Sequence, residues 1–167
     1  MGAIAFLGGA AVMTLELAAV RLLAPRFGDS APVWTNTIGV ILVALALGAS
    51  LGGRLAGRSR PARSLGLVFA GAAVWAAVTP WFAQPIGAWL LPPALPLDAA
   101  MGALVGGSLA ATTELFAPPV VLLGCVFPLL VTIRVQATQG GTNGAGATAA
   151  VGRAAGLVST WSTLGSL

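Results

Sequence analysis

Carboxylates, hydroxyl groups and an amide are the side chains in this sequence whose types and positions could support chemistry. Glu16 lies in an apolar run nine residues before Pro25, which is about 13 Å along a helix. A carboxylate at that depth in a membrane usually faces a partner helix or a cavity. We therefore expect Glu16, with Thr14 and Asn36, to form a candidate polar site inside the membrane.

Two interpretations of Glu16 stay open. It could line a site for a proton or substrate, or it could only hydrogen-bond a neighbouring helix. Arg21, five residues further on, lies at the wrong angle to stack on it as an i,i+4 pair. We expect Arg21 to reach the headgroups instead. Glu114 comes just before Pro118 and Pro119, and we expect it to be interfacial and solvated.

The residue types exclude several kinds of site. The sequence has no histidine or tyrosine and a single cysteine, Cys125, which excludes an internal disulfide and a Cys/His zinc site. It shows no nucleophile with a nearby base and no glycine-rich phosphate loop in a strand–turn–helix context. We expect no catalytic residue, no cofactor and no metal, and no enzymatic activity unless a soluble catalytic domain follows Leu167.

The composition is that of a membrane protein. Of 167 residues, 57% are hydrophobic and 7% are charged, whereas soluble domains carry about 25% charged residues. Nucleic-acid binding is not expected, because lysine is absent and the arginines lie mostly at the ends of apolar runs, facing headgroups. The expected partners are the lipid bilayer and other membrane protein subunits.

Runs of about 20 mainly apolar residues can cross a bilayer as helices. The six candidate spans are residues 2–24, 33–53, 64–82, 97–117, 118–135 and 149–167. They predict an all-α, polytopic transmembrane helical bundle of about five to seven spans, with half of a major-facilitator-like architecture as one arrangement. Residues 1–135 form the predicted bundle, 136–148 a flexible polar loop, and 149–167 the start of a further span in a truncated chain.

Arg54, Arg58, Arg60 and Arg63 form a basic loop between two apolar runs. The positive-inside rule places this loop and the N-terminus in the cytoplasm. A second basic pair, Arg134 and Arg153, flanks a loop that also looks cytoplasmic. Three crossings between Arg63 and Arg134 would place that loop outside. Either one weak segment does not cross, or residues 86–95 form a re-entrant piece.

Glycines four residues apart permit close approach of helices. Three such pairs predict a tightly packed bundle: Gly48 with Gly52, Gly102 with Gly106, and Gly152 with Gly156.

Four blocks of sequence resemble a known family. They are residues 16–28 (ELAAVRLLAPRFG), 48–58 (GASLGGRLAGR), 124–130 (GCVFPLL) and 152–165 (GRAAGLVSTWSTLG). In this order they resemble the membrane domain of bacterial spermidine-synthase-like proteins, the fused MFS/spermidine synthase type. The resemblance implies the bacterial inner membrane and a membrane module without the soluble catalytic domain that binds decarboxylated S-adenosylmethionine and a polyamine.

Three functions follow from these features. The first is an anchor or accessory subunit that packs in a larger membrane assembly. The second is a transporter-like half for a small solute such as a cation, using Glu16. The third is the N-terminal part of a membrane-bound aminopropyltransferase-like enzyme.

Overall fold

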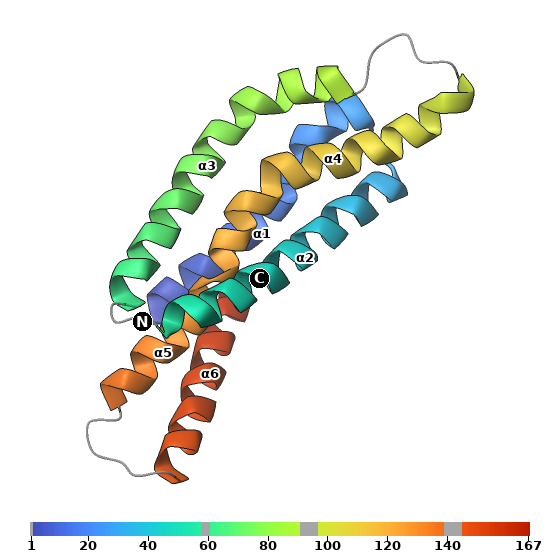
Figure 1. The fold of residues 1–167 in the computed structure, drawn as a ribbon. Helices are drawn as coiled ribbons and strands as arrows, with labels where there is room; N and C mark the ends of the chain where they lie inside the picture. Colours follow the sequence, from blue (N-terminus) through green and yellow to red (C-terminus); the bar gives the residue numbers. More distant parts are fainter. Residues whose placement is uncertain (1, 58–60, 91–96, 139–144) are drawn as a thin grey trace.

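The computed structural model describes residues 2–57, 61–90, 97–138 and 145–167. This part of the chain is α-helical, as predicted (Figure 1). Its helices are α1 (Gly2–Phe27), α2 (Ala31–Ala56), α3 (Pro61–Leu90), α4 (Leu97–Gly124), α5 (Val126–Thr138) and α6 (Ala145–Gly165). Four of the described spans are long and apolar enough to cross a membrane: α1, α2, α3, and α4 together with α5. They indicate an integral membrane protein.

A short turn reverses the chain between α1 and α2. Gly28 follows the end of α1 with a φ of 75°, and its N–H donates to the carbonyl of Ala24 at 2.9 Å. Glycine adopts this left-handed conformation without steric cost and commonly ends helices. Ser30 then has an extended backbone before α2, and Pro32 occupies the first turn, where its missing N–H leaves no gap in the helix.

Residues 97–138 form one bent helical segment that counts as a single candidate span, whereas the sequence predicted two spans, 97–117 and 118–135. α4 continues through Pro118 and Pro119 and ends at Gly124. At the bend, the Cys125 N–H donates to the Leu122 carbonyl at 3.0 Å. Pro128 has no N–H for the Gly124 carbonyl, which accounts for a break here rather than a continuous helix. α5 then carries the chain onward to Thr138.

A single candidate span at residues 97–138 is consistent with the basic loop and the pair Arg134 and Arg153 lying on the same side. α3 runs from the Arg63 end to the opposite end of the bundle, and α4 with α5 runs back (Figure 1). Arg134 therefore lies toward the same end as Arg54 and Arg63. α6 begins at that end too, which places Arg153 there.

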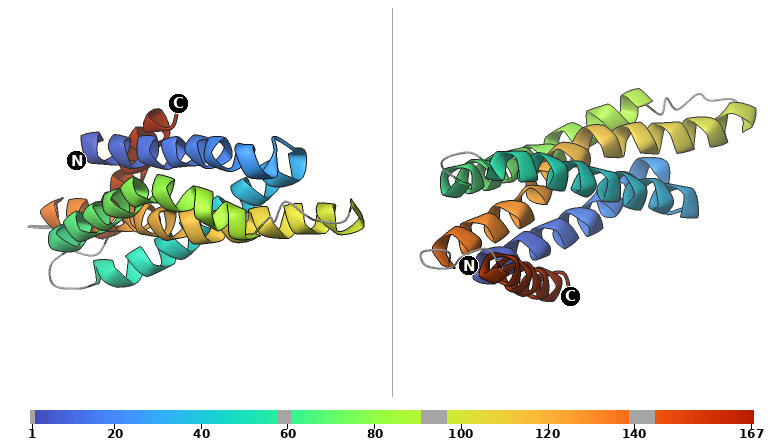
Figure 2. Two further views of the ribbon diagram at one scale, coloured as in Figure 1. Left: turned by 90° about the horizontal axis from the view of Figure 1, so that it is seen from above. Right: turned by 60° about the horizontal axis from the view of Figure 1, so that its bottom comes forward.

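Three clusters of buried apolar side chains follow one another along the bundle. The cluster near the basic end joins the first turns of α1 and α3 to α5 and α6, with Ala5, Leu65, Leu129 and Val158 among its members. A small central cluster joins α2 to α4. A third cluster near the α1–α2 turn surrounds Phe27. Figure 2 shows α6 crossing α1 at a steep angle near the N-terminus.

One of the three predicted glycine pairs makes a close helix crossing. A Cβ on Gly48 would lie 2.8 Å from the Gly124 Cα, and one on Gly52 would lie 2.6 Å from the Cys125 Cα. Those distances leave no room for a side chain, so α2 meets the bend between α4 and α5 backbone to backbone. Around Gly102, Gly106, Gly152 and Gly156, by contrast, a Cβ would meet nothing within 4 Å.

The helices extend into both ends of the predicted polar loop, 136–148. α5 includes residues 136–138, and α6 begins at residue 145. The part of the loop at 139–144 lies outside the described residues.

Candidate functional site

The three residues of the predicted polar site make separate interactions. The Thr14 hydroxyl donates to the carbonyl of Ala10 within its own helix, at 2.7 Å. The Asn36 amide donates to Val105 O and to Ser108 Oγ, both at 2.9 Å, and so joins α2 to α4. Glu16 is half-buried and makes no hydrogen bond or ion pair with the described residues. No described hydrogen bond links the three side chains.

Glu16 lies near the middle of the length of the bundle. Its neighbour Leu15 packs against the central cluster of Ile41, Ala44 and Val120. Ile41 and Ala44 lie near the middle of α2. Leu15 also packs against the cluster around Phe27, so Glu16 lies between the centre of the bundle and the α1–α2 turn, where a carboxyl group inside a membrane would be costly.

Glu114 lies at a similar depth, and the expectation that it is interfacial is wrong. α4 runs parallel to α2, with Asn36 against Ser108 and Gly48 against Val121. Glu114 falls between those two contacts, level with the centre of α2. The error came from ending a span at Pro118, whereas the helix continues for many residues beyond it. Glu114 is exposed on the surface of the bundle and has no partner among the described residues.

A hydrogen-bonded junction between α3 and α4 shows how the helix continues through the second of its two prolines, Pro119. Pro119 has no N–H, so the carbonyl of Leu115, four residues earlier, loses its partner within the helix. The Trp75 indole N–H donates to this carbonyl at 3.2 Å, and the Thr79 hydroxyl lies 3.4 Å from it. In lipid, a carbonyl freed by proline must be satisfied by such neighbours. In the sequence, Pro119 already indicates that the carbonyl four residues earlier, at Leu115, needs a donor from outside its own helix.

A groove of about 580 Å³ opens beside this junction. From α3 it is lined by Val74, Trp75, Val78, Thr79, Phe82 and Ile86, and from α4 by Glu114, Leu115 and Pro118. The lining is mostly apolar and aromatic, and Glu114 is the acidic residue in it. Phe82 is 54% exposed, so the groove opens onto the surface that lipid would cover.

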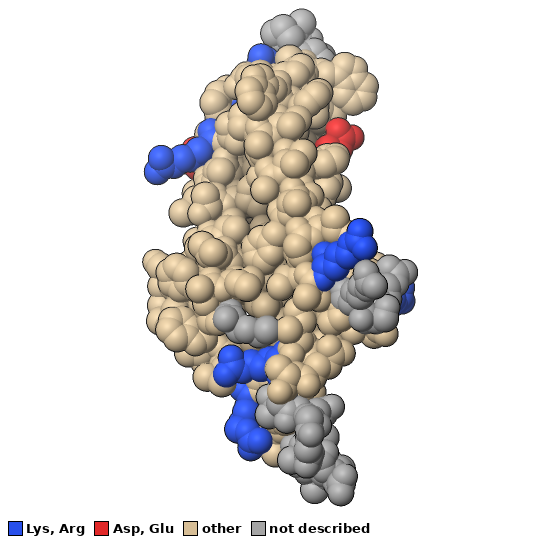
Figure 3. Space-filling model, turned by 90° about the vertical axis from the view of Figure 1, so that its left-hand side faces the viewer, with Lys and Arg blue, Asp and Glu red and all other residues tan. Residues whose placement is uncertain are grey.

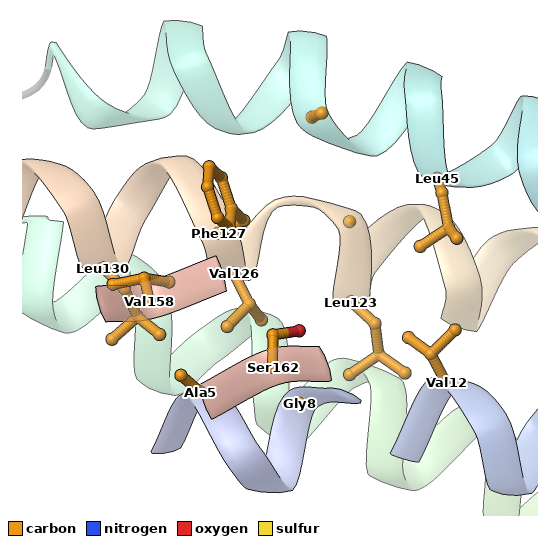
Figure 4. Close-up of a pocket in the computed structure, with 12 residues that line it drawn as sticks. Ala5, Gly8, Val12, Leu45, Leu123, Val126, Phe127, Leu130, Val158 and Ser162 are labelled. Atoms are coloured by element: carbon orange, nitrogen blue, oxygen red, sulfur yellow. The ribbon is translucent and has the colours of Figure 1, made fainter. Parts of the chain in front are cut away.

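A second, smaller cavity lies where the bend between α4 and α5 faces α1 and α6. It measures about 220 Å³, and Figure 4 shows side chains from several helices around it, including Val12, Leu123, Val126 and Ser162. Ser162 is the polar side chain among those labelled. An apolar lining of this kind favours apolar contents over water.

The described part of the basic loop includes Arg54 and Arg63, both exposed; Arg58 and Arg60 lie outside the described residues. Figure 3 shows isolated basic side chains and two small acidic patches on an otherwise uncharged face. Among the described residues, no group of three or more metal-ligating side chains comes together. The geometry thus offers two unpaired carboxyl groups at mid-depth and no described cluster of reactive groups.

Comparison with family models, curated proteins and solved structures finds no match to this chain.

Proposed function

We propose that this chain is a membrane module that anchors or completes a larger assembly by packing against other transmembrane subunits. The observation that carries the proposal is the contrast among its glycine pairs. The space beside Gly48 and Gly52 is occupied by a neighbouring helix of the same chain. The space beside Gly102 and Gly106, and beside Gly152 and Gly156, is open. Small-residue faces of this kind let helices of different subunits approach closely.

The resemblance to the membrane domain of spermidine-synthase-like proteins supports the same proposal. Two of the blocks that carry it, 48–58 and 124–130, meet at the crossing of Gly52 with Cys125 and Pro128. Residues that share a packing contact are expected to recur together in a family. On this proposal the chain is the membrane part of such a protein, and it performs no reaction of its own.

The proposed location is the bacterial inner membrane, with the N-terminus and the basic loop in the cytoplasm. The support comes from charge. Arg54, Arg63, Arg134 and Arg153 lie toward one end of the bundle and Arg21 and Arg26 toward the other, and the end of a membrane bundle that is richer in arginine stays in the cytoplasm.

The size of the particle in mild detergent tests the subunit proposal. We expect the native protein to migrate as a complex much larger than its 16.5 kDa chain. Replacing both glycines of one open face by leucine should dissociate that complex, whereas Leu42→Trp, which adds bulk at a lipid-facing position of α2, should not. A solitary monomer in native membranes would contradict the proposal.

A transporter-like half remains the second candidate, because Glu16 lies at mid-depth without a described partner. Unpaired carboxyl groups inside membranes often mark the route of a proton or cation. The test is uptake of a small cation by liposomes that contain the protein. Uptake that Glu16→Gln abolishes would support this candidate, and equal uptake by both forms would exclude a role for that carboxyl group.

A further inference from the structure

Glu114 presents an ionisable group where the bundle should meet lipid tails. It is exposed, level with the middle of α2, and without a partner among the described residues. A carboxyl group at this depth is expensive to leave alone, and such groups normally pair with a cation or a polar group. The described residues supply neither on this face, which leaves the position open to a partner from outside.

The groove beside Glu114 indicates what kind of partner fits. Its volume of about 580 Å³ is within the range of small-ligand sites, roughly 300–1,000 Å³. The lining from Val74 to Ile86 follows α3 for twelve residues, which is about 18 Å along a helix. An elongated apolar body can therefore lie along α3 while a polar group at one point reaches Glu114.

The lining also selects the charge of that polar group. Trp75 and Phe82 provide aromatic rings beside the carboxyl group, and both ring types attract cations. The Trp75 indole N–H is already engaged with the Leu115 carbonyl, and the Thr79 hydroxyl with the Trp75 carbonyl at 2.9 Å and more weakly with that of Leu115. A neutral ligand would therefore gain little beyond apolar contact, whereas an ammonium group would gain a charge-assisted hydrogen bond with the carboxylate.

We propose that the groove between α3 and α4 binds an amphipathic amine from the bilayer, with its ammonium group at Glu114 and its apolar body along α3. Entry is lateral, since the groove opens on the lipid-facing surface. This site goes beyond the subunit role proposed above and shares no residue with the two open glycine faces, so either can fail without the other.

Fluorine NMR on the intact chain in lipid nanodiscs tests this site, with para-fluorophenylbutylamine as the probe. Its neutral counterpart, para-fluorophenylbutanol, controls for partition into lipid. We expect a saturable bound signal for the amine that empty nanodiscs lack. Glu114→Gln should weaken the binding affinity for the amine about tenfold or more, because it removes a charged acceptor. Glu16→Gln, the matched change at similar depth, should leave binding unchanged.

A second variant separates the groove from the charge. Val78→Trp should block the amine by filling the groove while it leaves Glu114 in place. Equal binding of amine and alcohol, unchanged binding in Glu114→Gln, or no saturable binding would each overturn the proposal. Absence of amine binding, with a cysteine at position 78 cross-linking to another polypeptide in native membranes, would assign the groove to a partner helix instead.

Discussion

At the scale of single residues, the polar side chains of this chain differ in whether the bundle satisfies them. Asn36 reaches across to α4 and finds two acceptors, whereas Glu16 and Glu114 find none among the described residues. A polar group that is satisfied within the bundle stabilises the fold. One that is not satisfied is available to a ligand or a partner.

Replacing Asn36 with leucine should therefore destabilise the bundle. Interhelical hydrogen bonds in membranes contribute about 0.6 kcal/mol on average and up to about 1.7 kcal/mol. Because Asn36 contacts both Val105 O and Ser108 Oγ, we expect a loss of about 1 kcal/mol in the free energy of unfolding. Equilibrium unfolding in mixed micelles with added dodecyl sulfate measures it.

Thr35→Val is the matched control, because its hydroxyl bonds only to the Ala31 carbonyl of its own helix. An Asn36→Leu variant as stable as this control would show that the contact between α2 and α4 does not stabilise the fold.

At the scale of helices, two local contacts, which are the two devices tested below, position the lipid-facing groove and the bend. The first is the Leu115 carbonyl, which Pro119 frees and α3 satisfies. The second is the close crossing of α2 with the bend at Cys125, which glycines permit. Each makes a separate prediction.

A double-mutant cycle tests the first device. Combining Trp75→Phe with Thr79→Val should destabilise the protein by roughly 1–3 kcal/mol, because the Leu115 carbonyl is left without a donor. In a Pro119→Ala background the restored N–H can bond to that carbonyl, so the same two changes should have a much smaller effect. If the two changes reduce the free energy of unfolding equally in both backgrounds, Trp75 and Thr79 do not stabilise the protein through the freed Leu115 carbonyl.

Alanine substitutions test the second device. Gly48→Ala places a Cβ 2.8 Å from the Gly124 Cα, and overpacking of this kind destabilises by about 1–3 kcal/mol. Gly53→Ala has nothing within 4 Å of its Cβ and should be neutral, or stabilise by up to about 1 kcal/mol through helix propensity. The same unfolding assay compares them, and a Gly48→Ala protein as stable as Gly53→Ala would contradict the close crossing.

At the scale of the whole molecule, the sequence predicted which segments form long apolar helices better than where one helix ends and the next begins. Apolar runs of sufficient length marked α1, α2 and α3, because lipid requires such runs wherever helices cross. The join at Pro118 and Pro119 was missed, because proline normally ends helices. Its tolerance here depends on Trp75 and Thr79, about forty residues away in the sequence.

The same error explains what was predicted about the site. The helix of Glu16 was expected to end before Pro25, whereas it includes Pro25 and ends at Phe27. Glu114 was placed at an interface because its helix was ended too early. The groove beside it could not be predicted at all, since it depends on how α3 and α4 pack.

The central claim is that residues 97–138 cross the membrane once, so that Arg54, Arg63, Arg134 and Arg153 share one side. Single cysteines at Asp29, Ala62, Gln136 and Thr148, each exposed, test it in a Cys125→Ala background with a membrane-impermeant maleimide. In intact cells we predict labelling of position 29 alone, with positions 62, 136 and 148 labelled only after lysis. Labelling of positions 29 and 136 together, with position 62 protected, would show a second crossing and contradict the account.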